Sequence, residues 1–144
     1  MRAIILSIVF CLASSIGWSK SVMLKDLVEN PGDGLVYNKF LTMPFTGTAN
    51  TTYESGQLKT LFNFIDGETQ GQAEEYYESG QLKSKFNLEN GELNGPHETF
   101  YENGQLKYNW NYKDGKMHGL QEDFDEDGSQ LFSIKYENGV YIAD

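Results

Sequence analysis

The sequence predicts an all-β fold, an elongated antiparallel meander of tandem 24-residue β-hairpin repeats. Three observations predict it. Residues 53–59 recur almost unchanged at 77–83 and 101–107, which gives a period of 24 residues. Glycines stand in columns with the same period. Between them lie short runs in which large apolar and polar residues alternate, the pattern of strands with one buried face.

The glycine columns predict the turns. Glycine in a fixed column marks a backbone position that needs a positive φ, and Asn-Gly and Asp-Gly pairs are typical of tight hairpin turns. We therefore expect eight structural turn glycines: Gly56, Gly80, Gly104, Gly128, Gly67, Gly91, Gly115 and Gly139. A third column consists of Gly47, Gly71, Gly95 and Gly119.

The alternating runs predict the strands. Residues 62–64, 86–88 and 110–112 each place a polar residue between two large apolar ones. A second column is expected to point inward on the other strand of each unit: Tyr76, Phe100 and Phe124. One hairpin cannot bury its apolar face, but stacked repeats can. At two strands per repeat, about seven to nine short strands are expected. The fourth copy shifts its leucine by one, to Leu131, so we expect a β-bulge or a slip in strand register there.

The chain divides into three parts. Residues 1–19 have the positive start, apolar run and small-residue end of a secretory signal peptide. An uncleaved anchor helix is the alternative, although the apolar run is shorter than the roughly 20 residues that a span needs. Residues 20–34 form a lead-in, with a candidate helix over 22–30. Residues 35–144 form the repeat domain of about four units, with degenerate first and last units.

Charge and cysteine usage limit the partners. The formal net charge is −10, and it becomes −11 without residues 1–19, which hold Arg2 and no acidic residue. Such a chain repels phosphates, so we expect no nucleic-acid or anionic-membrane binding and favour a basic protein partner. The single cysteine, Cys11, lies in the predicted signal peptide. The mature chain then has no disulfide. Because of the predicted signal peptide, we expect the mature chain to be periplasmic or secreted.

The repeat resembles a known family. Residues 110–119 read Trp-Asn-Tyr-Lys-Asp-Gly-Lys-Met-His-Gly, similar to the membrane occupation and recognition nexus (MORN) repeat. Residues 101–107, Tyr-Glu-Asn-Gly-Gln-Leu-Lys, resemble the variant MORN repeat of bacterial proteins. Residues 34–37 and 44–47 resemble the opening of a group labelled as antitoxins. The resemblance covers roughly residues 35–140 and implies a β-hairpin repeat that is used for binding.

A search for catalytic or metal-binding residues favours neither. Ser55 and Ser79 fall inside turns, and His97 and His118 occupy non-equivalent repeat positions at or beside turns. We interpret both histidines as solvated turn residues. The densest acidic cluster, at 123–127, lacks the twelve-position pattern of a calcium loop. We therefore expect no enzyme, no metal and no cofactor.

Tyrosines are the candidate partner-binding residues. If the column of Tyr76 points inward, strand alternation turns the next residue outward. The candidates are Tyr53, Tyr77 and Tyr101. Tyrosine is enriched in protein interfaces. The alternative is that these side chains cover neighbouring strands or that the sheet is packed on both faces.

Together these features predict a non-catalytic, extracytoplasmic protein-binding module. One version is an antitoxin-like or immunity-like neutraliser that covers the active face of a toxic protein. The alternative is an envelope structural or polysaccharide-binding β-repeat protein, because tyrosine ladders also stack on sugars.

Overall fold

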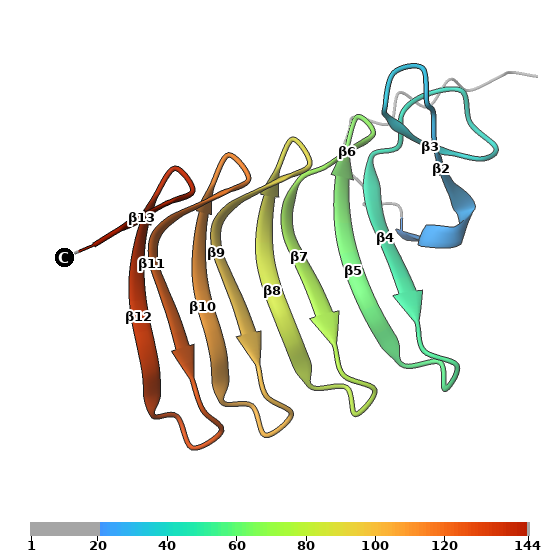
Figure 1. The fold of residues 1–144 in the computed structure, drawn as a ribbon. Coiled ribbons are helices and arrows are strands. Elements are labelled where there is room, and N and C mark those ends of the chain that lie inside the picture. The colour runs from blue at the N-terminus through green and yellow to red at the C-terminus, as the bar shows by residue number, and fades with distance from the viewer. Residues whose placement is uncertain (1–20, 144) are drawn as a thin grey trace, which may run out of the picture.

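The computed structural model describes residues 21–143, so the predicted signal peptide lies outside the described residues. These residues form one 11-stranded sheet and a small two-stranded sheet near its start (Figure 1). The strands are β1 (Ser21–Met23), β2 (Leu27–Glu29), β3 (Val36–Asn38), β4 (Gly47–Thr52), β5 (Leu58–Ile65), β6 (Glu68–Thr69), β7 (Gly71–Tyr76), β8 (Leu82–Glu89), β9 (Glu92–Phe100), β10 (Leu106–Lys113), β11 (Lys116–Phe124), β12 (Gln130–Glu137) and β13 (Val140–Ile142).

Four successive hairpins make up most of the large sheet. We call β4–β5 unit 1, β7–β8 unit 2, β9–β10 unit 3 and β11–β12 unit 4. Neighbouring strands along the sheet pair antiparallel, and only β1 pairs parallel, with β4. The antiparallel meander is thus confirmed. The large sheet has more strands than expected because β1, β6 and β13 add to the eight strands of the four units.

Two kinds of turn alternate along the meander. At one end of the strands, Asn90 and Gly91 take φ values of 51° and 80°, and the equivalent pairs in the other units also have two positive φ values. Two successive positive φ values define a type I′ turn, which matches the twist of the flanking strands. At the other end of the strands, five-residue turns contain the glycines of the Gly56 column, which have φ values of 87° to 90°. All eight predicted turn glycines have positive φ.

Every unit contains a bulge at the same place. In unit 4, Asp123 pairs with Phe132 and Phe124 pairs with Gln130, so Leu131 is the extra residue. The predicted bulge is confirmed, but it is not special to this unit. The equivalent extra residues in units 1 to 3 are lysines: Lys59, Lys83 and Lys107. Leu131 therefore stands where the other units have a lysine.

The lead-in is not the predicted α-helix. Residues 22–30 instead contain the end of β1, a single 3₁₀ turn η1 (Leu24–Asp26) and β2. Val22 and Leu24 pack against a buried cluster of Phe45, Ala49 and Phe64. So short a helix is marginal on its own, and pairing with β4 and β3 lets the same apolar residues reach that cluster. We call η1, β2 and β3 the cap.

The pairing registers give the large sheet two different faces. Cross-strand partners share a face and successive residues alternate. We call the first the aromatic face, and the row across its middle contains Ala49, Phe62, Ala73, Phe86, His97, Trp110, Gln121 and Ile134. We call the other the polar face, and it contains Asn63, Gln72, Lys85, Asn87, Glu98, Asn109, Asn111 and Leu120.

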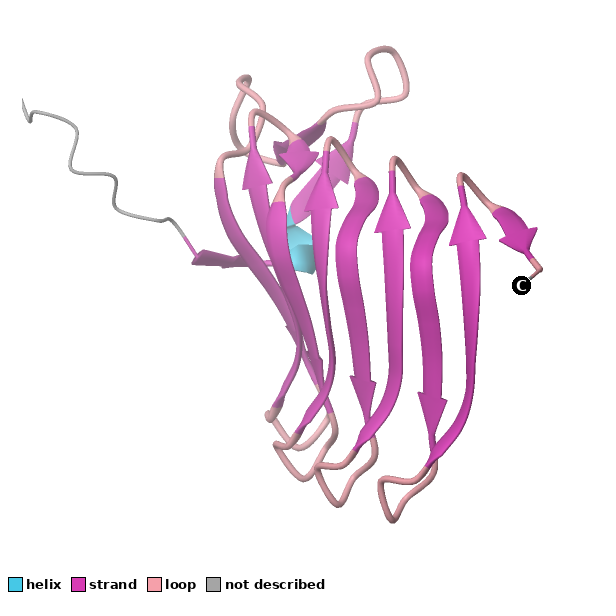
Figure 2. Cartoon of the chain, turned by 90° about the vertical axis from the view of Figure 1, so that its left-hand side faces the viewer, coloured by secondary structure: helices cyan, strands magenta, loops and turns pink. Residues whose placement is uncertain are grey.

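The cap covers only the start of the aromatic face. Its apolar residues pack on the cluster of Phe45, Ala49 and Phe64, which includes two residues of unit 1. Figure 2 shows the cap lying to one side of the first strands, whereas the later strands form a single curved layer. Within residues 21–143, the extensive contacts of units 3 and 4 are with neighbouring strands of the same sheet.

One predicted column lies on the other face. Phe100 was expected to share an inner face with residues such as Phe86. It follows Glu98 by two positions in β9, and the ammonium of Lys85 lies 5.8 Å from its ring centre. Glu98 pairs in register with Lys85, so Phe100 lies on the polar face. The bulge in each unit separates the two columns, which the assumed strict alternation did not include.

Candidate functional site

The aromatic face carries a continuous row of large side chains in units 1 to 4. The rings of Phe62 and Phe86 are 6.3 Å apart, and those of Phe86 and His97 are 5.1 Å apart. Further along the sheet, Trp110 lies 5.2 Å from Tyr108. All of these side chains are only partly buried. The arrangement leaves apolar ring surface available to a binding partner.

An apolar pocket of about 190 Å³ lies on this face between units 3 and 4. We call it the tryptophan pocket, and it is lined by Trp110, Met117, Gln121, Phe132, Ile134 and Tyr136. The indole Nε1 of Trp110 donates to Oδ1 of Asp123 at 2.8 Å, which fixes the ring. Phe132 is 44% exposed. Aromatic walls with a fixed orientation are typical of anchor pockets in protein interfaces.

Gln121 forms the polar base of the tryptophan pocket. Its side chain is 3% exposed. Its Nε2 donates to the main-chain oxygen of Asn111 at 3.0 Å, and its Oε1 accepts from the amide of Asn111 at 3.1 Å. The register between β10 and β11 shifts at this point, so the ladder there is irregular. The Gln121 amide therefore satisfies backbone groups that the irregular strand pairing leaves free.

A second pocket, of about 310 Å³, lies between units 2 and 3 on the same face. We call it the histidine pocket, and it is lined by Glu75, Ser84, Phe86, Leu88, Leu93 and His97. His97 was expected to be a solvated turn residue, and that prediction is wrong. The residue lies in the middle of β9, because that strand already begins at Glu92. The sequence signal was available: His97 stands where units 1 and 2 have Ala49 and Ala73.

Ser84 and His97 form a polar contact inside the histidine pocket. The hydroxyl oxygen of Ser84 lies 3.2 Å from the carbonyl oxygen of Glu98 and 2.9 Å from Nε2 of His97. A serine has one proton to donate, so it donates to one of these two atoms at a time, and the donor of the contact with Nε2 depends on the histidine tautomer. Nδ1 of His97 is buried without a protein partner. Burial lowers the pKa of His97, while the Glu75 carboxylate acts in the opposite direction.

The predicted tyrosines hold successive repeats together. Their hydroxyls donate to carbonyl oxygens 23 residues further along, from Tyr53 to Tyr76 at 2.7 Å, from Tyr77 to Phe100 at 2.8 Å and from Tyr101 to Phe124 at 3.0 Å. A lysine ammonium also lies 5.1 Å from the Tyr101 ring centre. This linking role was missed, although the identical spacing of tyrosine and partner was a signal for it. Partner binding by these tyrosines stays a prediction.

The remaining candidates serve local structure. Ser55 and Ser79 are exposed in turns, as expected. In the acidic stretch, Asp125 Oδ1 accepts from the amide of Ser129 at 3.0 Å, and Asp127 Oδ1 accepts from the hydroxyl of Ser129 at 2.6 Å. These bonds shape the turn before β12. Residues 21–143 contain no group of three or more histidine, cysteine or acidic side chains that could hold a metal ion.

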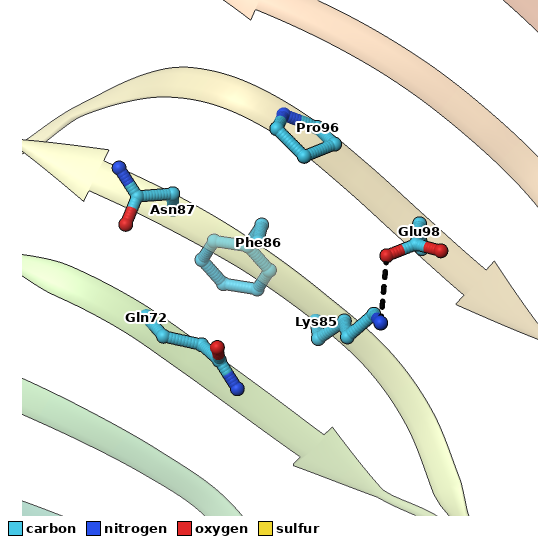
Figure 3. A pocket seen from close by; sticks show the side chains of 6 residues that line it. All are labelled: Gln72, Lys85, Phe86, Asn87, Pro96 and Glu98. Atoms are coloured by element: carbon cyan, nitrogen blue, oxygen red, sulfur yellow. Dashed lines mark ion pairs between the residues drawn. The ribbon is translucent and has the colours of Figure 1, made fainter.

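The polar face has a shallow depression of its own, of about 230 Å³ (Figure 3). Lys85 and Glu98 form an ion pair of 2.8 Å across it. Asn87 donates from its side chain to the carbonyl oxygen of Asn94 at 3.0 Å. In Figure 3 the ring of Phe86 is seen through the ribbon of β8, away from Lys85 and Asn87. Mutual pairing of its polar groups makes this depression a weaker candidate than the aromatic face.

Comparison with known families agrees with the repeat geometry. The model of the MORN repeat variant matches residues 69–90 and 93–114. The two matched segments coincide with units 2 and 3. Units 1 and 4 share the strand, bulge and turn geometry of the two matched MORN units. No curated protein and no solved structure shows significant similarity to the chain. In the described part, no helix is both long and apolar enough to span a membrane.

Proposed function

We propose that this chain is a non-catalytic module that binds another protein through the aromatic face of its MORN units. The observation that carries the proposal is the row of ring and aliphatic side chains that continues beyond the cap. Unit 1 shows how the face is used, because cap residues Leu24, Leu27 and Val36 pack against the cluster that contains Ala49 and Phe64. An apolar partner would cover units 2 to 4 in the same way and bury the same kind of surface.

The chemistry of the surface favours a basic partner with apolar anchor residues. The net charge of −10 attracts basic proteins. Glu75 and Asp123 lie on the aromatic face itself, level with Ser84 and Tyr108. A partner would place a large apolar side chain in the tryptophan pocket and basic side chains beside these carboxylates.

The Ser84–His97 contact supports a non-catalytic function. A serine nucleophile must give its proton to the histidine. Here the Ser84 hydroxyl lies within hydrogen-bond distance of the Glu98 carbonyl oxygen as well as of Nε2 of His97, so its proton has a competing acceptor. The Nδ1 atom, which an orienting carboxylate would contact in a triad, has no protein partner. The arrangement suits a packed polar contact better than a nucleophile and its base.

The finer version of the proposal concerns place and role. Residues 1–19 read as a secretory signal peptide, so the partner would lie outside the cytoplasm. An antitoxin-like or immunity-like neutraliser would use the aromatic face to cover a toxic protein that reaches the cell envelope. A polysaccharide ligand is the competing proposal, because rows of aromatic rings stack on sugars.

Site-specific photocrosslinking tests the proposal. A photoreactive phenylalanine analogue is placed at position 132 in the full chain, on the aromatic face, or at the exposed Leu120 on the polar face. Both are produced in cells that make the protein. A protein adduct that forms from position 132 and not from 120 supports binding through this face. Equal adducts from both positions, or capture of polysaccharide alone, contradict it.

A further inference from the structure

We propose that the histidine pocket takes the cationic side chain of a lysine or arginine from the bound protein, with Glu75 as its counter-ion. This inference rests on the proposed protein-binding function and names one specificity determinant of that face. The pocket combines apolar walls with a carboxylate, which suits a side chain that has an aliphatic stem and a charged head.

The walls fit the two parts of such a side chain. Leu88, Leu93 and the Phe86 ring line the pocket and can contact the methylene stem. Glu75 also lines it and keeps 38% of its side chain exposed, so its carboxylate is open to a ligand. A cation near the Phe86 ring gains a cation–π contribution. The chain already has one such contact on this face, with Lys107 5.0 Å from the Tyr108 ring centre.

His97 adds no competing positive charge to the pocket. Burial lowers the pKa of its imidazole below the ordinary 6.5, which leaves the ring neutral near pH 7. An ammonium or guanidinium group has donors and no acceptor, and the Glu75 carboxylate that lines the pocket supplies the acceptors it needs. The lining residues therefore carry one negative charge and no positive one, which favours a cationic ligand.

Within the chain, Glu75 has only a loose partner. The Lys83 ammonium lies 3.6 Å from it, and the two side chains are 45% and 38% exposed. Exposed pairs of this kind contribute little to stability. A ligand cation enclosed by Phe86 and the leucines would be better shielded from water than Lys83, and so would replace it.

The combination occurs once in the repeat array. Glu75, Ser84 and His97 lie together on neighbouring strands. One unit earlier the equivalent residues are Thr51, Thr60 and Ala73, and one unit later they are Thr99, Tyr108 and Gln121. Neither set contains a carboxylate. Residues needed for stacking recur in each unit, as the turn glycines do, so a set that appears once is better explained by recognition.

Small cationic probes test the pocket without the unknown partner. The full chain, labelled with ¹⁵N, is titrated with N-acetyl-lysine methylamide and N-acetyl-arginine methylamide, and with N-acetyl-norleucine methylamide as the neutral match. Saturable amide shifts around Leu88, Leu93 and His97 are expected with at least one cationic probe. Glu75→Gln should weaken that binding on the order of tenfold, the worth of one charge-assisted contact. Glu78→Gln, at an exposed turn, should leave it unchanged.

The outcomes separate this inference from the proposed function. Equal binding of the neutral probe, absence of saturable shifts, or binding that Glu75→Gln leaves unchanged would overturn the pocket assignment. None of these results affects crosslinking from position 132, which tests protein binding by itself. Thermal unfolding of Glu75→Gln and Glu78→Gln checks that both variants remain folded.

Discussion

The Tyr77 hydroxyl donates to the carbonyl oxygen of Phe100 at 2.8 Å, which joins the turn of unit 2 to the last residue of strand β9 in unit 3. Equivalent bonds join the neighbouring units, from Tyr53 and from Tyr101. Repeat arrays gain stability from interfaces between neighbours. These bonds belong to that interface, and they lie at the ends of the strands that the five-residue turns connect.

Tyr77→Phe should therefore destabilise the fold. The substitution keeps the ring and removes the donor, leaving the Phe100 carbonyl without that bond, at a cost of about 1 kcal/mol. Chemical denaturation of both variants measures the change, with Tyr141→Phe, at a 57% exposed residue, as control. Equal stability of the Tyr77→Phe variant and its control would mean that the bond contributes nothing to the array.

Two glycines of one column should differ in their response to alanine. Gly67 and Gly91 both have positive φ, at 87° and 80°, so either alanine adds roughly 1–2 kcal/mol of backbone strain. A Cβ at Gly67 would also lie 2.9 Å from the Cβ of Leu35 and 3.0 Å from backbone atoms of Val36. At Gly91 the nearest atom is 3.8 Å away. Thermal melts should show Gly67→Ala as clearly the less stable variant, and the reverse order would refute the packing of cap against turn.

Gln121→Leu should cost about 1–3 kcal/mol, although leucine is more apolar. The substitution leaves the amide and carbonyl of Asn111 without the bonds that Gln121 supplies at a buried position. The exposed Gln81→Leu is the matched control. The denaturant midpoints of the two variants are compared. A neutral or stabilising effect of Gln121→Leu would show that water hydrogen-bonds the main-chain groups of Asn111 equally well.

The stability of the fold should fall at mildly acidic pH partly through His97. Burial lowers its pKa in the folded chain below the ordinary 6.5. As the pH drops below about 6.5, the unfolded chain takes up the proton first, so the free energy of unfolding decreases until the pH has passed the folded pKa.

His97→Ala should reduce that slope, since alanine occupies the same position in units 1 and 2. Urea unfolding from pH 7.5 to 5 measures it, with His118→Ala as control for removing a histidine. An unchanged slope in His97→Ala would show that other groups cause the acid sensitivity.

The period of the sequence predicted the fold because turn chemistry and strand alternation repeat together. Pairs such as Asn90-Gly91 favour a tight hairpin turn. The bulge at Leu131 was predicted from the shifted leucine, but the units without that shift contain the same bulge, so the shift was not its cause. The lead-in was mispredicted because its apolar spacing also suits a short helix, and only the buried cluster with Phe45 decides between them.

Face assignment could not be predicted in the same way. The bulge in each unit inverts the alternation between columns, so Phe100 and Trp110 of unit 3 lie on opposite faces, which strict alternation would not give. The link from Tyr77 to Phe100 joins residues from different hairpins, and strand periodicity carries no information about it. His97 could have been recognised from the sequence, because it stands in a column where units 1 and 2 have alanine. Its role could not be predicted, because the pocket around it also needs Ser84 and Glu75 from other strands.

The most direct test of the account is the affinity of the protein that crosslinks from position 132 for two variants of the full chain. Calorimetry compares Phe132→Asp on the aromatic face with Leu120→Asp on the polar face, both at exposed sites. The account predicts at least about a tenfold loss of affinity for Phe132→Asp, as for an anchor residue, and little change for Leu120→Asp. Equal affinities for the two variants would contradict binding through the aromatic face.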